Sequence, residues 1–465
     1  MSKKNIIFCS LNIFFIVLLA YAVWLFSKPF WSFNAAKIVQ NSTLKERILT
    51  PDIIAINSPE GYNAWFVEDH NASLASLHFY FDRSGYAYDA PKKEGLSYMV
   101  AQLLLRGAGQ YNEEEYLSIL ELNGVKLDFS VSDETFDVAM TAPVQNLDMA
   151  AKLLNEALTK PRFSFEDINL VKTQIIEIAK TDAENPQKVL NKAFKKAFFG
   201  THPKARGAKG NKESVQNITR RDLISFVGTH FAKDNLTIAL VGDLSLEDAE
   251  NFLSKVFSNL PSKFQKVTDL EALMPNYDIK EQNIERDMPQ VLAKFVARAP
   301  KRLDEDFYAL YMANEIFGGS GLSSRLNLMA REKKGLTYGA YTYLNPVKDA
   351  PRIEGSFATS KENEEKMREI LFNEWQKMAD FGVSQGEFDA IRQNMLTSFN
   401  LRFKSISDIA AQILYMQKEH LGIDFFKKRN DYVKNITLED VNAAAKKYFS
   451  NPPAVITIGG NNFKE

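Results

Sequence analysis

An internal repeat is the feature of this sequence that most limits its fold. The motif Asn-Ile-Thr219 precedes a helical stretch and then a β-rich run that ends at Gly242. The motif Asn-Ile-Thr437 precedes the same pattern, which ends at Gly460. Both pairs of matching positions are 218 residues apart (437 − 219 and 460 − 242). Because helices and strands alternate within each copy, we expect two copies of one α+β unit to make up most of the chain.

Each copy of the repeated helix has a start signal. Thr219 and Thr437 are residue types that cap helix N-termini, and Asp222 or Asp440 follows three positions later. This pattern is a variant of the capping box, in which two side chains satisfy free backbone N–H groups at the start of a helix. The sequence therefore predicts a helix that begins directly after each threonine.

Other segments have the periodicity of regular structure. Residues 75–81 alternate between apolar and polar types, which predicts a strand. Residues 167–180, 307–317 and 365–378 have apolar side chains at helical spacing. We therefore expect each domain to be a mostly antiparallel sheet with helices packed on one face.

Composition shifts suggest where the domains end. The segment 260–286 is rich in charged residues, Pro and Asn, as linkers are. We predict an N-terminal anchor or signal with a polar stalk at 1–46 and a first domain at 47–264. A linker follows at 265–285, and the second domain spans 286–465.

An apolar run near the N-terminus predicts export. Residues 6–26 are interrupted only by Ser10 and Asn12. As a helix this run is roughly 31 Å long, about the thickness of a bilayer core. Lys3 and Lys4 precede the run and keep the N-terminus on the inner side of the membrane.

The apolar run has two interpretations. It is either a single-pass anchor or a signal peptide, since Ala20-Tyr21-Ala22 is an acceptable small-residue cleavage site. In both cases the rest of the chain lies on the exported side of a membrane, which in a bacterium is the periplasm. The only cysteine is Cys9, so cysteine pairing gives no information on the compartment.

The charge balance gives no sign of a nucleic-acid partner. The chain has 57 basic and 58 acidic residues, and its formal net charge is −1. Nucleic-acid-binding surfaces need a basic patch or stripe, and no block of Lys and Arg is long enough to form one.

Three stretches together carry a family resemblance. They are Glu94-Gly-Leu-Ser-Tyr-Met-Val-Ala-Gln-Leu-Leu-Leu-Arg-Gly107, His202-Pro-Lys-Ala-Arg-Gly-Ala-Lys-Gly-Asn-Lys-Glu-Ser-Val-Gln-Asn-Ile-Thr219, and Gly318-Gly-Ser-Gly-Leu-Ser-Ser-Arg-Leu running on through Arg331-Glu-Lys-Lys-Gly-Leu-Thr-Tyr338. Over about residues 48–460 the chain resembles the insulinase family of zinc metallopeptidases, which includes pitrilysin and the mitochondrial processing peptidases. The second and third stretches are the most specific.

The resemblance implies a zinc site that this chain has lost. The family places H-x-x-E-H on the first of these stretches, with two zinc-binding histidines, a glutamate that activates water, and a distant glutamate as third ligand. Here the three motif positions are Tyr98, Ala101 and Gln102, and only the distant glutamate has a match, Glu177. A catalytic zinc needs three protein ligands. We therefore expect no metal and no catalytic residue in this chain alone, with Glu177 as a relic.

The first stretch also has an ordinary explanation. A helix over these residues would pack its apolar side chains in a core, and this is the interpretation that we prefer. The residues concerned are Leu96, Met99, Val100 and Leu103.

The resemblance also implies a substrate-binding pair in the second domain. In the family an arginine and a tyrosine seven positions apart reach the bound peptide, and their match here is Arg331 and Tyr338. A tyrosine hydroxyl can donate to an oxyanion, and a guanidinium can bind peptide carbonyls. The glycines Gly318, Gly319 and Gly321 predict a flexible or positive-φ loop before the pair. Alternatively, the pair is a solvent-facing charge and a half-buried ring.

These features predict a helper subunit. In the family two halves, each of two domains, close around an unfolded peptide, in one chain or in two. With two repeats this chain would be one half, the non-catalytic, substrate-binding subunit of a heterodimer whose zinc-motif-bearing partner holds the zinc. A non-proteolytic scaffold or peptide-binding protein is the first alternative. A self-sufficient hydrolase is the second, although none of the five histidines has ligand spacing.

If residues 6–26 are an anchor, the full chain stays with membranes through high-salt and carbonate washes, because an inserted helix is not removed as an adsorbed one is. Membrane fractionation with mass spectrometry of the N-terminus measures this. A mature protein that is soluble and begins at Val23 would instead identify a cleaved signal peptide.

Overall fold

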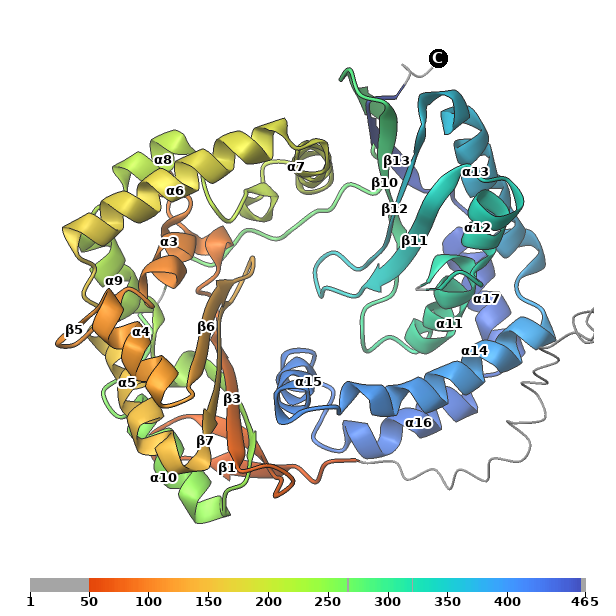
Figure 1. Ribbon diagram of the computed structural model, residues 1–465. Coiled ribbons are helices and arrows are strands. Elements are labelled where there is room, and N and C mark those ends of the chain that lie inside the picture. Colours follow the sequence, from red (N-terminus) through yellow and green to blue (C-terminus); the bar gives the residue numbers. More distant parts are fainter. Residues whose placement is uncertain (1–49, 266, 320, 461–465) are drawn as a thin grey trace, which may run out of the picture. The chain divides into compact units, whose positions relative to one another are not determined.

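The computed structural model describes residues 50–265, 267–319 and 321–460 (Figure 1). The predicted anchor and stalk at 1–46 lie outside these residues. Within the described part of the chain, no helix combines the length and the apolar character needed to cross a bilayer.

The elements fall into two successive sets. The strands of the first set are β1 Ile54–Asn57, β2 Asn63–Glu68, β3 Leu74–Phe81, β4 Gly107–Ala108, β5 Tyr111–Asn112, β6 Lys126–Val131, β7 Phe136–Pro143 and β8 Leu236–Gly242. Its helices are α3 Leu96–Leu103, α4 Glu113–Leu122, α5 Leu147–Thr159, α6 Phe165–Glu184, α7 Pro186–Phe199, α8 Lys212–Asn217, α9 Arg220–His230 and α10 Leu246–Phe257. The strands of the second set are β9 Gln282–Ile284, β10 Gln290–Arg298, β11 Thr337–Asn345, β12 Arg352–Ser360 and β13 Ala454–Ile458. Its helices are α11 Phe307–Gly318, α12 Arg325–Asn327, α13 Glu364–Phe381, α14 Gln385–Ser398, α15 Ile406–Lys418, α16 Phe425–Asn435 and α17 Leu438–Phe449.

The two main sheets have the same topology. The first has the order β1-β2-β8-β3-β7-β6 and the second the order β11-β12-β10-β13-β9. Reading the second from β9 matches it, strand for strand, to β2-β8-β3-β7-β6. In each sheet one pair is parallel, β2 with β8 and β13 with β9, and these pairs are equivalent. The predicted fold of two homologous, mostly antiparallel α+β domains is confirmed.

The predicted helix starts are confirmed as well. Thr219 caps α9 and Thr437 caps α17, and each hydroxyl accepts a hydrogen bond from the backbone N–H of the aspartate three positions later. The carboxylates of Asp222 and Asp440 in turn accept from the backbone N–H of the threonine, at 2.7 and 2.9 Å. An acidic group at a helix N-terminus is also favoured by the helix dipole.

Each sheet packs helices on one face around a large apolar core. Alternation along β3 directs Leu77, Phe79 and Phe81 into the first core, where all three are fully buried. His78 and Tyr80 therefore lie on the opposite face. In the second core Phe295, Phe317 and Trp375 are buried together, with edge-to-face ring contacts.

A helix from the second repeat covers part of the opposite face of the first sheet. Helix α15 contacts β3 and β8. Its buried residues Ile409, Ala410, Ile413 and Met416 pack against residues of β2 and β8. Those partners in the sheet are Val67, Ala239 and Val241.

In the same way, a helix of the first repeat packs on the second sheet. Helix α7 contacts β10 and β13 of the second sheet, and its rings Phe194 and Phe198 pack on Val296 and Ile456. Shifting the bounds of α7 by 218 positions gives 404–417, within two residues of α15. The two repeats therefore exchange equivalent helices, and residues from 50 onward form one compact unit.

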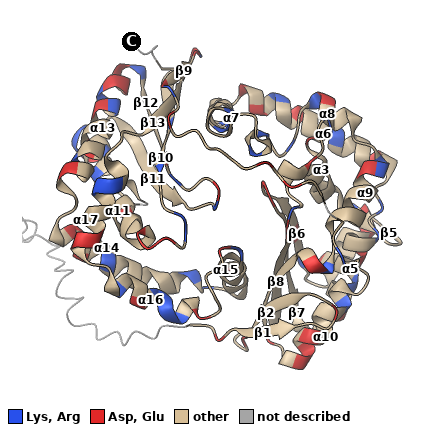
Figure 2. Cartoon of the chain, turned by 180° about the vertical axis from the view of Figure 1, so that it is seen from behind, with Lys and Arg blue, Asp and Glu red and all other residues tan. Residues whose placement is uncertain are grey.

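Buried charge also joins the repeats. The Nζ atom of Lys204 lies 2.6 Å from Oε1 of Glu134 in the first repeat and 3.6 Å from Oδ2 of Asp349 in the second. The lysine side chain is 2% exposed, whereas the side chains of Glu134 and Asp349 are 35% and 47% exposed. On the helices of both repeats, basic and acidic residues are interspersed (Figure 2).

The segment predicted as a linker is packed in part. Strand β9 lies within 265–285 and pairs with β13, and Ile279 is buried against the second sheet. The hydroxyl of Tyr277 donates to the carbonyl of Pro351 at 2.7 Å. Since β9 has only three residues, its sequence lacks the alternation that identifies longer strands. The three predicted boundaries between the four segments stay predictions.

The exchanged helix should stabilise the whole unit. Ile413→Ala removes a fully buried side chain from the α15 contact, and we expect the free energy of unfolding to fall by about 2–5 kcal/mol. Urea denaturation measures it. Ile178→Ala, at an exposed position of α6, is the matched control and should change stability by less than about 0.5 kcal/mol. Equal effects would mean that the α15 contact is not stabilising.

Candidate functional site

Hydrogen bonds to a buried carboxylate hold the N-terminus of helix α3, which carries the degenerate zinc motif. The buried carboxylate of Asp89 accepts hydrogen bonds from the backbone N–H groups of Gly95 at 2.8 Å and Ser97 at 3.0 Å. Burial raises the pKa of Asp89 to about 7, so this group titrates near neutral pH. The position of α3 thus depends on a carboxyl group that precedes it by seven residues.

The second family-like stretch supports the start of α3. A Cβ atom on Gly210 would lie 1.9 Å from the carbonyl oxygen of Glu94, so only glycine fits. The hydroxyl of Ser214 donates to the same carbonyl at 2.8 Å, and Lys93 pairs with Asp222 at 2.6 Å. This stretch therefore holds α3 in place.

The four degenerate metal positions lie on α3 and α6, which pack together. Tyr98 is half-buried and Gln102 is exposed, whereas Ala101 is 2% exposed and belongs to the apolar core. Glu177 on α6 is exposed, and its Oε1 accepts from Nζ of Lys180 at 2.5 Å. Among the described residues, no group of three or more His, Cys, Asp or Glu could hold a metal ion. A phenol, a methyl group and an amide do not fit a zinc ion.

Arg331 and Tyr338 lie on adjoining elements of the second repeat. Arg331 is in a π-helical turn, Leu328–Lys333, and its side chain is half-exposed. Tyr338 is the second residue of β11, where the register against β12 shifts between Thr337 and Ala340. This irregularity aims the tyrosine outward, and it is 84% exposed. π-Helical turns and strand irregularities of this kind are frequent at functional sites.

A buried amide fixes this region. Asn327 is fully buried, and its Oδ1 accepts from the backbone N–H of Ala340 at 3.0 Å. Its Nδ2 donates to the carbonyl of Gly321 and to the hydroxyl of Ser324, both at 3.2 Å. One side chain thus ties the glycine-rich loop to β11. Two of its partners, Gly321 and Ser324, are three to six positions away, and the third, Ala340, is 13 positions away on β11.

The glycine-rich loop differs from expectation. Gly318 and Gly319 are not among the positive-φ residues of the described chain, so the positive-φ alternative is wrong for these two. Close packing explains both. A Cβ on Gly318 would lie 2.6 Å from Oγ1 of Thr342, and one on Gly319 would meet the side chain of Glu315 at 2.5 Å.

Arg325 in the same stretch has a structural partner. Its Nε and Nη2 each donate to one carboxylate oxygen of Glu387, at 2.7 Å. These bonds lower the pKa of Glu387 to about 2. Because the carboxylate of Glu387 also accepts from the backbone N–H of Ser384, the pair joins α12 to the start of α14. Arg325 is therefore held in an ion pair within the domain, whereas Tyr338 is exposed to solvent.

The chain matches known proteins over most of its length. Residues 66–211 match the family described as Insulinase (Peptidase family M16), and residues 217–395 match Peptidase M16 inactive domain. A protein of Helicobacter pylori named non-peptidase homolog YmxG is 24% identical over 402 residues, which are 86% of this chain and 92% of that protein.

Solved structures share the fold. A peptidase M16 inactive domain from Pseudomonas fluorescens superposes with a TM-score of 0.81 at 24% identity, covering 89% of this chain and 99% of that one. The periplasmic protease PqqL from Escherichia coli gives a TM-score of 0.74 at 14% identity, covering 89% of this chain but 46% of that one. The chain therefore belongs to peptidase family M16, the insulinase family. With Tyr98, Ala101 and Gln102 at the zinc motif, it is a non-catalytic member.

We expect the purified protein to hold no stoichiometric zinc after dialysis, measured by elemental analysis. One zinc per chain would contradict this. Restoring the full motif with Tyr98→His, Ala101→Glu and Gln102→His places a carboxylate at a buried core position, so this variant should lose about 3 kcal/mol or more of stability. The matched double variant Tyr98→His with Gln102→His changes only half-buried and exposed positions and should fold normally.

Proposed function

We propose that this chain is the non-catalytic, substrate-binding subunit of a heterodimeric M16 zinc peptidase, and that it supplies Arg331 and Tyr338 to its partner's site. The observation that carries the proposal is the presentation of Tyr338. A tyrosine that is 84% exposed on an irregular strand, which the buried amide of Asn327 holds at Ala340, has no packing role in its own domain. Large exposed side chains held on rigid elements are typical of binding sites.

The chemistry of the pair suits peptide hydrolysis in a neighbouring site. Attack on a peptide carbonyl creates an oxyanion, which a hydroxyl donor from Tyr338 would stabilise. The guanidinium of Arg331 would bind peptide carbonyls through two donors. Its nearest carboxylate is Glu332, at 3.8 Å, so it is not committed to a tight ion pair.

The size of one structural neighbour supports a partner. The match to the periplasmic protease PqqL covers 46% of that chain, so a second, homologous half beside this fold would make an assembly of that size. The partner would carry the intact zinc motif and the zinc, and the substrate would be an unfolded peptide. We further propose that the complex acts on the exported side of a membrane, the bacterial periplasm. There residues 6–26 would anchor it, or it would be secreted after signal cleavage.

Removing the hydroxyl of Tyr338 should slow peptide cleavage by the complex without dissociating the two subunits. With this chain co-expressed with its zinc-motif partner, Tyr338→Phe should lower kcat on an unfolded peptide by about two to three orders of magnitude. Arg331→Ala should also raise KM, because substrate binding is lost along with transition-state stabilisation. Size-exclusion chromatography should show an unchanged heterodimer.

Two variants serve as controls for this assay. Tyr432→Phe removes a hydroxyl from an exposed tyrosine of α16, and Glu177→Gln neutralises the surviving metal-site carboxylate. Both should leave cleavage unchanged. An Arg331→Ala, Tyr338→Phe double variant that assembles and cleaves at the wild-type rate would reject the catalytic role and favour a scaffold.

A further inference from the structure

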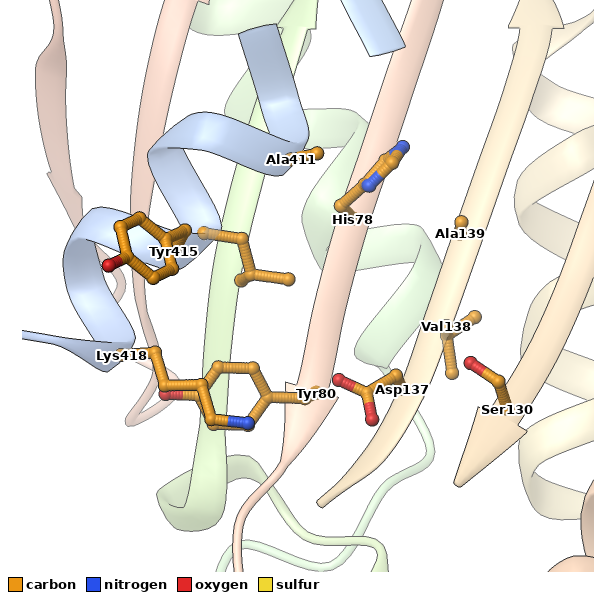
Figure 3. A pocket seen from close by; sticks show the side chains of 10 residues that line it. His78, Tyr80, Ser130, Asp137, Val138, Ala139, Ala411, Tyr415 and Lys418 are labelled. Atoms are coloured by element: carbon orange, nitrogen blue, oxygen red, sulfur yellow. The ribbon is translucent and has the colours of Figure 1, made fainter. Parts of the chain in front are cut away.

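A cavity of about 350 Å³ lies on the face of the first sheet opposite its main core, beside α15. Figure 3 shows His78 and Tyr80 from β3, Asp137 from β7 and Tyr415 from α15 around it. Val138, Ala139, Ala411 and Leu414 complete much of the apolar wall. A cavity of this size, with an apolar wall and a few convergent polar groups, is the usual form of a ligand site.

The polar groups of the cavity disfavour a charged ligand. Asp137 accepts a hydrogen bond from Oγ1 of Thr135 at 2.8 Å, and burial raises its pKa. His78 contacts the hydroxyl of Ser407 at 3.1 Å, and burial lowers its pKa, so the ring is neutral at neutral pH. Asp137 and Lys418, whose Nζ lies 5.5 Å from the ring centre of Tyr80, have opposite charges, so the lining favours neither an anion nor a cation. An uncharged ligand suits this balance and the apolar wall.

A larger cavity adjoins the small one. A second cavity of about 820 Å³ shares Tyr80 and Lys418 with it and is lined mostly by polar and charged residues of both repeats. An extended peptide in the larger, polar space could therefore place one side chain in the smaller, apolar space. Such a side chain would pass Tyr80 and Lys418, which line both cavities, and would then reach Ala411 and Tyr415, two exposed residues that line only the smaller one.

We propose that the cavity between β3, β7 and α15 is a specificity pocket for one large, uncharged aromatic side chain of a bound peptide. Its wall offers the rings of Tyr80 and Tyr415 for edge or stacked contacts, which aromatic groups prefer. Its polar groups, His78 and the hydroxyl of Ser130, suit a phenol as well as a phenyl ring. The proposal rests on the proposed function in that it takes the ligand to be an unfolded peptide.

Binding to the full chain alone tests the pocket. Fluorescence anisotropy would be measured with a labelled, unstructured peptide of Gly and Ser with one central Phe, and with peptides that have Tyr, Ala, Glu or Lys in its place. The Phe and Tyr peptides should bind about tenfold or more tightly than the Ala peptide, because a large apolar group is buried. The Glu and Lys peptides should bind no better than Ala. Equal affinity for all five, or no binding by any, would overturn the proposal.

Two variants of the cavity test whether the preference for the Phe peptide over the Ala peptide arises there. Ala411→Phe fills the cavity from an exposed helix position and should remove the preference for Phe over Ala. Ala443→Phe, at an exposed alanine of α17 away from the cavity, should keep it. Tyr415→Ala, which opens one wall, should weaken binding of the Phe peptide only. A preference that survives both pocket variants would place the site elsewhere. Since no partner or cleavage is involved, failure here is separate from failure of the Tyr338 assay.

Discussion

The apolar packing of α15 on β3 and β8, with that of α7 on β10 and β13, determines what the rest of this molecule can do. Each helix buries its apolar side against the sheet of the other repeat, so neither repeat covers its sheet alone. Burial of this kind is non-directional and large in sum. The cavity beside α15 exists only because one wall comes from each repeat.

The two repeats differ in the side chains that they place at their candidate functional positions. On α3 of the first repeat, the three positions of the degenerate zinc motif hold a half-buried phenol, a core methyl group and an exposed amide. In the second repeat, Tyr338 is exposed on β11, and the buried amide of Asn327 makes three hydrogen bonds to Gly321, Ser324 and Ala340. Loss of ligands has therefore left the scaffold intact, since Asp89, Gly95 and Gly210 still hold the start of α3.

The proposed roles depend on rigid support beneath each exposed group. Asn327 links the glycine-rich loop to β11, and the bidentate pair of Arg325 and Glu387 fixes the neighbouring helices. Buried and partly buried polar contacts of this kind are directional, so they hold a side chain more narrowly than apolar packing does. A peptide bound near Tyr338 would thus meet a surface that is already organised.

The sequence by itself determined the repeat, the helix starts at Thr219 and Thr437, and the loss of the zinc ligands. These features depend on local patterns or on residue identity, which can be read along the chain. Only the tertiary structure decided the exchange of α7 and α15, the roles of Asp89 and Asn327, and the cavity between β3, β7 and α15. His78 and Ser407 are 329 residues apart, and their contact follows from which apolar faces meet. The glycines of the loop show the same limit, because close packing against Thr342 and Glu315, and not backbone dihedral preference, requires them.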